Sequence, residues 1–204
     1  MKMRAWGVLL ILLTICLGCS HIQEYIDIAK DEAISKEYLD VLKKWTKDKI
    51  VYSQFETRAH IAVTYKSDEF NKAYISEYSR IYELTDVEKR EREETVVDLT
   101  SDFTEFMFYA YIPEKTSNDF ARSDSIWKVF IADGEGGKVY PVEIREIEKI
   151  TPIIEELFPY VKKYYGKFYT LKFSPLFPPF EQQPAMLVFT SVLGKVELTW
   201  GSKN

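Results

Sequence analysis

Histidine is the usual base in nucleophilic catalysis, and this sequence holds only two, His21 and His60. His60 lies between Ala59 and Ile61 in a stretch of alternating polar and apolar residues, which favours a surface position over a catalytic one. No GxSxG turn is present to indicate a serine nucleophile. A Ser-His-Asp triad assembled from distant residues stays compatible with the sequence. We nevertheless predict no catalytic residue.

Oxygen-bearing side chains in two loops are the only candidates for a metal site. Asn118, Asp119 and Asp124 lie in the first loop, and Asp133 and Glu135 lie in the second. Neither loop has the EF-hand spacing with its terminal Glu, which calcium binding by that motif requires. The segment DGEGG also lacks the Lys and Ser or Thr of a phosphate-binding loop. Because Asp, Asn and Gly favour turns, we predict no metal site and no cofactor.

A proline-rich loop, residues 174–184, is the first candidate for binding another molecule. It carries Leu176, Phe177 and Phe180 among four prolines. Proline stiffness lowers the entropic cost of presenting apolar side chains to a partner. These three residues are therefore a candidate partner-binding surface. The alternative is that the phenylalanines pack over an open end of the domain.

A basic and aromatic segment, YVKKYYGKFY, is the second candidate. Tyr160, Lys163, Tyr164 and Lys167 could stack on a sugar or another small ligand. The alternative is that the tyrosines belong to the core and the lysines lie in solvent, because Tyr164 continues an apolar helical pattern.

Helices are predicted where apolar residues recur at spacings of three and four, over about 33–46, 68–98 and 152–165. The later part of the second range has polar residues on nearly every side of the expected helix, which indicates a solvated helix or a linker. Thr85 and Glu88 have the spacing of a capping box there. Pro159 is expected to kink or split the third helix.

Strands are predicted in the remaining segments. Alternation over 51–66 predicts one long, half-buried strand. The stretch 103–113 is apolar on both faces, the three glycines of DGEGGK predict a hairpin, and Pro141 indicates an edge strand. The segments AMLVFTSV and KVELTW read as a final hairpin or one bent strand. Together these elements predict a single α+β domain over 33–204. Its fold is an antiparallel β-sandwich with appended helices, for which an immunoglobulin-like arrangement is one option.

The first nineteen residues have the layout of an export signal. Lys2 and Arg4 precede an apolar run, residues 5–13, which is shorter than the roughly 20 residues that cross a bilayer. The order Cys16-Leu17-Gly18-Cys19 resembles the lipobox of bacterial lipoproteins, although that family usually has Leu where Cys16 stands. In that family, cleavage precedes the final cysteine, which then receives acyl chains.

The resemblance implies a signal peptide at 1–18, lipidation of Cys19 and a lipidated tether at 19–32. Ser20 follows the lipidated cysteine, and the sorting rule of enteric-type bacteria then favours the outer membrane, facing the periplasm. An ordinary secretory signal or an uncleaved anchor is the alternative. Each of these options places the domain outside the cytoplasm.

Removal of residues 1–18 leaves Cys19 as the only cysteine, so no disulfide can form within the mature chain. Zinc needs closely spaced Cys or His ligands, which the mature chain lacks. Loss of Lys2 and Arg4 changes the net charge from −5 to −7, which argues against nucleic acid as a partner and leaves the acyl chains as the contact with the membrane.

We therefore predict a non-enzymatic cell-envelope lipoprotein with a binding or structural role, most readily through an envelope protein partner. A small-ligand or glycan-binding lipoprotein is the alternative, and an envelope hydrolase is less favoured than either.

Overall fold

The computed structural model describes residues 34–132, 136–183 and 185–200, without the side chains of 96–101. The predicted signal peptide at 1–18, Cys19 and the tether at 19–32 lie outside the described residues, as do Asp133 and Glu135. One of the two units into which the chain divides, Glu37–Asn204, holds both sheets and the pocket discussed below.

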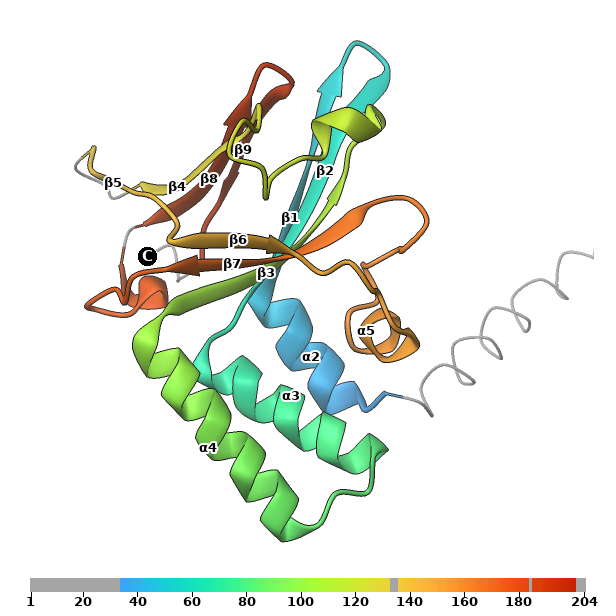
Figure 1. The fold of residues 1–204 in the computed structure, drawn as a ribbon, viewed down its shortest axis with the longest axis vertical. Coiled ribbons are helices and arrows are strands. Elements are labelled where there is room, and N and C mark those ends of the chain that lie inside the picture. Colours follow the sequence, from blue (N-terminus) through green and yellow to red (C-terminus); the bar gives the residue numbers. More distant parts are fainter. Residues whose placement is uncertain (1–33, 133–135, 184, 201–204) are drawn as a thin grey trace, which may run out of the picture. The chain divides into compact units, whose positions relative to one another are not determined.

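Two antiparallel sheets form the body of this unit (Figure 1). The five-stranded sheet has the order β1 (Thr46–Ser53), β2 (Glu56–Tyr65), β3 (Thr104–Tyr111), β7 (Lys167–Phe173), β6 (Glu143–Glu146). The four-stranded sheet has the order β5 (Lys138–Val139), β4 (Lys128–Ala132), β8 (Met186–Ser191), β9 (Gly194–Leu198). The predicted α+β sandwich is confirmed. Its strand order differs from the immunoglobulin order, in which the second and third strands lie in different sheets, because β2 and β3 pair directly.

In the part of the chain that the structure describes, four helices accompany the sheets. They are α2 (Lys36–Trp45), α3 (Asp68–Ile81), α4 (Asp86–Asp102) and α5 (Pro152–Leu157), with short 3-10 turns η1 (Lys115–Ser117) and η2 (Phe180–Gln182). The helices α2, α3 and α4 lie together beside one end of the five-stranded sheet, away from the β1–β2 and β8–β9 turns (Figure 1). Within the described residues, no helix has the length and apolar character that crossing a membrane requires.

The core lies between the two sheets. Phe106 and Phe108 of β3 are fully buried, and Phe108 meets Phe189 of β8 at a ring-centroid distance of 5.2 Å. The sheets also meet at their edges, where the Trp200 indole donates a hydrogen bond of 2.7 Å to the Trp45 carbonyl oxygen. The other face of β3 is covered as well, as its composition predicts.

The prediction of one long strand over 51–66 is wrong, because this segment spans the turn of the β1–β2 hairpin. Gln54 occupies the turn with a positive φ of 56°, and Phe55 beside it is fully exposed. A register irregularity follows Val51. Next to the turn the paired residues have opposite parity, as in Ser53 with Glu56, but the register irregularity restores equal parity from the pair Val51 and Ala59 onward. The alternation of the two strands therefore stays in step and conceals the turn.

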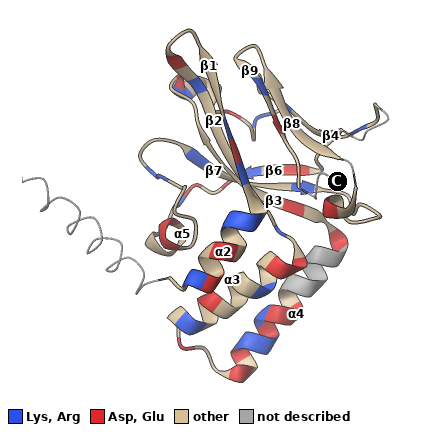
Figure 2. Ribbon diagram, turned by 180° about the vertical axis from the view of Figure 1, so that it is seen from behind, with Lys and Arg blue, Asp and Glu red and all other residues tan. Residues whose placement is uncertain are grey.

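Helices are present in all three predicted ranges, but not all of them have the predicted length. The range 68–98 is two helices, and Thr85 begins the second with the predicted capping box. Charged residues of both signs alternate along α4 (Figure 2), and most of those whose side chains are described are exposed, as expected for a solvated helix. The helix predicted over 152–165 ends at Leu157, because the residue before Pro159 is sterically excluded from helical geometry and the proline has no N–H to donate.

The predicted turns and edges are also present. β8 and β9 form the final hairpin, and β5 returns against β4 after the glycine segment. Pro141 lies between β5 and β6, which are edge strands of different sheets. A proline is tolerated there because no ladder hydrogen bond is needed from its nitrogen.

Gly166 is required where the segment after α5 approaches β3. A Cβ at this position would lie 2.6 Å from the Tyr109 hydroxyl oxygen and closer still to the Ala110 carbonyl oxygen. We expect Gly166→Ala to lower the free energy of unfolding by about 1–3 kcal/mol through overpacking, measured by urea unfolding. Gly136→Ala is the control for steric contact, because a Cβ there would meet nothing within 4 Å and only the positive φ of this residue opposes the change. Equal losses in both variants would contradict the steric explanation.

Candidate functional site

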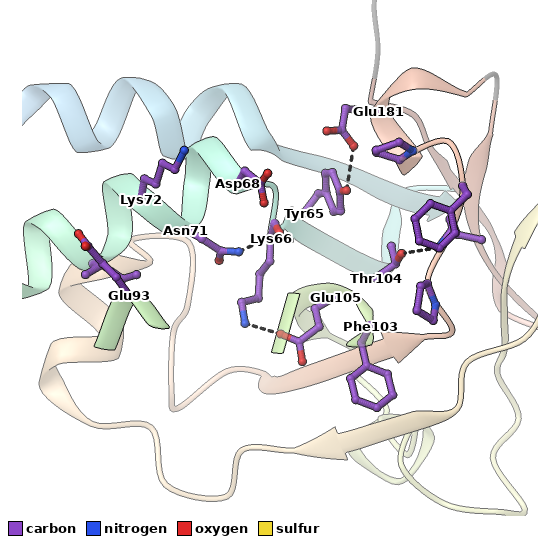
Figure 3. A pocket seen from close by; sticks show the side chains of 15 residues that line it. Tyr65, Lys66, Asp68, Asn71, Lys72, Glu93, Phe103, Thr104, Glu105 and Glu181 are labelled. Atoms are coloured by element: carbon purple, nitrogen blue, oxygen red, sulfur yellow. Dashed lines mark hydrogen bonds and ion pairs between the residues drawn. The ribbon is translucent and has the colours of Figure 1, made fainter. Parts of the chain in front are cut away.

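A pocket of about 680 Å³ opens between α3, α4, the start of β3 and the proline-rich loop (Figure 3). Its volume lies within the range typical of small-ligand sites. One wall is polar and charged, and the other is built from apolar loop residues. The lining residues are Tyr65, Lys66, Asp68, Asn71, Lys72, Ile75, Glu93, Phe103, Thr104, Glu105, Pro175, Leu176, Phe177, Pro179 and Glu181.

The pocket lies where the α3–α4 insertion leaves the sheet and returns to it. The Lys66 amide donates to the Glu105 carbonyl oxygen at 3.0 Å, so the end of β2 and the start of β3 remain paired. Ser67 then caps α3 by accepting a hydrogen bond of 3.2 Å from the Phe70 amide. This cap directs the first turns of α3, with Asp68 and its neighbours, along the pocket.

A charged cluster begins in the polar wall and extends beyond it. The Glu105 side chain is only 10% exposed and forms an ion pair with Lys66. It also faces the Lys172 ammonium group at 3.4 Å, and Lys172 in turn lies 3.6 Å from Glu143. The Lys172 nitrogen lies 5.0 Å from the centre of the Phe103 ring. A buried carboxylate with two ammonium partners is held in one orientation.

Tyr65 joins the polar and apolar walls. Its hydroxyl group donates a hydrogen bond of 2.8 Å to Glu181 Oε2. Burial raises the pKa of Tyr65 well above its usual range, and the hydrogen bond to Glu181 and the nearby charge of Asp68 raise it further. Tyr65 therefore stays protonated at neutral pH and keeps Glu181 beside the pocket.

The proline-rich loop forms the apolar wall, and the structure separates its three predicted partner-binding residues. Leu176 and Phe177 line the pocket, and the Leu176 amide donates to Thr104 Oγ1 at 3.2 Å. Phe177 is 85% exposed, whereas Phe180 is fully buried and packs against Phe106 and Trp200. Phe180 is therefore a core residue that anchors the loop, and Phe177 lies at its surface.

The second predicted site lies elsewhere. Tyr160 is half-buried, and its hydroxyl is 2.7 Å from Thr64 Oγ1. Burial raises the pKa of Tyr160 above its usual range. Tyr164 is exposed, and Lys163 and Lys167 lie 3.7 and 2.8 Å from carboxylates of their own, Glu155 and Glu146 respectively. None of the four predicted residues lines the 680 Å³ pocket.

The remaining candidates have structural partners. His60 lies at the surface of β2 with its Nε2 atom 3.0 Å from Asp48. Asn118 is buried and donates to the Ala110 carbonyl oxygen, and Asp124 pairs with Arg122. In the described ranges, no group of three or more His, Cys, Asp and Glu side chains is arranged to hold a metal ion.

The polar wall was not predicted from the sequence. Its Lys66 and Glu105 are 39 positions apart, so no local spacing connects them. A weak signal was available, because Thr104 and Glu105 interrupt the otherwise apolar stretch FTEFMFYAY at the start of a covered strand. A charge inside such a strand needs a partner.

No protein-family model and no curated protein matches this sequence. Among solved structures, the chain is similar to the crystal structure of a protein of unknown function from Burkholderia pseudomallei. The TM-score is 0.44, and the sequences are 12% identical over 86% of each chain.

Proposed function

We propose that this protein is a lipid-anchored, non-enzymatic binding protein of the cell envelope, and that the 680 Å³ pocket is its binding site. The observation that carries the binding role is the pocket itself. It combines a volume suited to a small ligand with one apolar wall and a few convergent polar groups, the usual composition of ligand sites.

The proposed anchor rests on the lipobox-like segment that ends at Cys19. Acyl chains there would hold the domain at the outer membrane, on the periplasmic side. We expect Cys19→Ala to move the protein from the membrane fraction to the soluble fraction, or to leave its precursor unprocessed, without lowering the unfolding temperature of the domain. Fractionation with metabolic labelling by a fatty acid measures this. A variant that is still acylated and membrane-bound would contradict the assignment.

The pocket is tested by site-specific photo-crosslinking in cells. A p-benzoylphenylalanine replaces Phe177 at the pocket rim, and a second variant carries it in place of Phe55. Both side chains are exposed, so both variants should fold, but Phe55 lies at the β1–β2 turn and does not line the pocket. We expect a low-mass adduct at position 177 and none at position 55, detected by mass spectrometry of the intact protein.

A protein partner is the second candidate, favoured by the 85% exposure of Phe177 on a proline-stiffened loop. A protein adduct specific to position 177 would support this candidate. The absence of any adduct specific to position 177 would count against the pocket as a binding site.

A further inference from the structure

The charges around the pocket are not balanced. Glu105 and Glu143 are offset by Lys66 and Lys172, which lie against them. The other charged lining residues are one lysine, Lys72, and three acids, which leaves an excess of two negative charges. The three acids are Asp68, Glu93 and Glu181.

These three carboxylates can accept further interactions. Glu181 receives one hydrogen bond at Oε2, from Tyr65. Asp68 and Glu93 make no ion pair with any residue that the structure describes. Asp68 and Glu181 lie on the Tyr65 side of the pocket, and Glu93 enters from α4 on another side (Figure 3).

An apolar and aromatic surface lines the same pocket as these acids. Leu176 and Phe177 come from the loop, and Phe103 immediately precedes β3. An aromatic ring packs against apolar groups and also attracts a cation placed over its face. This pocket combines such rings with excess carboxylates. A ligand that uses both walls therefore has an apolar body and a positively charged group.

We infer that the pocket selects an amphipathic organic cation, with its apolar body against Leu176 and Phe177 and its charged nitrogen toward Glu181 and Glu93. This inference rests on the proposed function, because it assigns the ligand class of the same pocket. Electrostatic attraction to the carboxylates is expected to favour such a ligand over a neutral or anionic molecule of equal shape.

Three probes with one apolar body test this assignment: 4-phenylbutylammonium, 4-phenylbutanol and 4-phenylbutyrate. The full-length protein is placed in lipid nanodiscs, and binding is measured by equilibrium dialysis against empty nanodiscs. We expect the ammonium probe to bind about tenfold more tightly than the carboxylate probe. Binding of all probes should weaken in Phe177→Ala and be unchanged in Phe55→Ala.

Matched variants locate the source of selectivity. Glu93→Gln/Glu181→Gln removes two pocket charges while keeping side-chain shape and the acceptor for Tyr65. Glu91→Gln/Glu94→Gln removes two charges from α4 that do not line the pocket. We expect the preference for the ammonium probe to disappear in the first variant and to remain in the second.

The outcomes separate the two proposals. One outcome is binding that depends on Phe177 but in which the carboxylate or alcohol probe has the same affinity as the ammonium probe or a higher one. This outcome would overturn the inferred ligand class and leave the binding function standing. Equal selectivity in both double variants would overturn it too. If no probe shows Phe177-dependent binding, the pocket fails as a binding site and the inference fails with it.

Discussion

Phe180→Ala is expected to lower the free energy of unfolding by about 3–5 kcal/mol, the usual cost of deleting a fully buried aromatic side chain. The Phe180 ring is inaccessible to solvent and contacts Tyr65, Phe106 and Trp200, with centroid distances of 5.2 to 5.7 Å. Alanine would leave a cavity among these rings, which a rigid core cannot fill by relaxation. Urea unfolding followed by tryptophan fluorescence measures the loss.

Phe177→Ala is the matched control, because it makes the same chemical change three positions away in the same loop. Phe177 is 85% exposed, so we expect its unfolding free energy to stay within about 0.5 kcal/mol of the original. A small loss for Phe180→Ala, or similar losses for both variants, would show that the loop is not anchored as described.

The comparison also decides how the loop should be tested for binding. A variant that lacks both phenylalanines would lose stability and surface together, so a lost partner could reflect unfolding. Phe177→Ala alone changes the surface and keeps the anchor. Binding measurements should therefore use the single variant.

Glu105→Ala is expected to be the second most damaging change, with a loss of about 3 kcal/mol in unfolding free energy. The Lys66 and Lys172 side chains are only 22% and 20% exposed, and both have Glu105 as a partner. Removing the carboxylate would leave two partly buried ammonium groups with too little negative charge between them. Glu105→Gln keeps the shape and an acceptor oxygen, so we expect an intermediate loss.

Asp124→Asn is the control, because it removes an ion pair that is exposed to solvent. Asp124 and Arg122 form a bidentate pair, but both side chains are more than two-thirds exposed to water. Water and salt screen such pairs, so no measurable change in urea unfolding is expected. If Glu105→Ala were as mild as Asp124→Asn, the charged cluster would not be a structural support of the pocket.

The fold class could be predicted from the sequence because the hydrophobic pattern matches the observed burial over long segments. The β3 stretch is apolar on both parities and is covered on both faces, and Thr85 and Glu88 form the expected capping box. The turn at Gln54 escaped prediction because the register irregularity beside Val51 brings the alternation of β1 and β2 back into step. Pro159 signalled the end of α5, but the apolar pattern beyond it indicated a longer helix than geometry allows.

The pocket could be predicted only in part. Leu176 and Phe177 were predicted because the short segment that holds them combines prolines with large apolar residues. Phe180 has the same local composition as Phe177, and only the distant rings around it make it a core residue. The polar wall combines side chains from residues 65–72 with Glu93, Thr104 and Glu105, and the proximity of the two groups depends on the pairing of β2 with β3.

The hydrogen bond between Trp200 and Trp45 has a consequence for the order in which the protein can be made. It joins residues 155 positions apart, and β9 supplies Val196 and Leu198 to the same core. A nascent chain that still lacks this segment therefore cannot close its core, and distant pairings of this kind form slowly. The unfinished chain should stay open during synthesis, which suits the proposed passage through a membrane before folding.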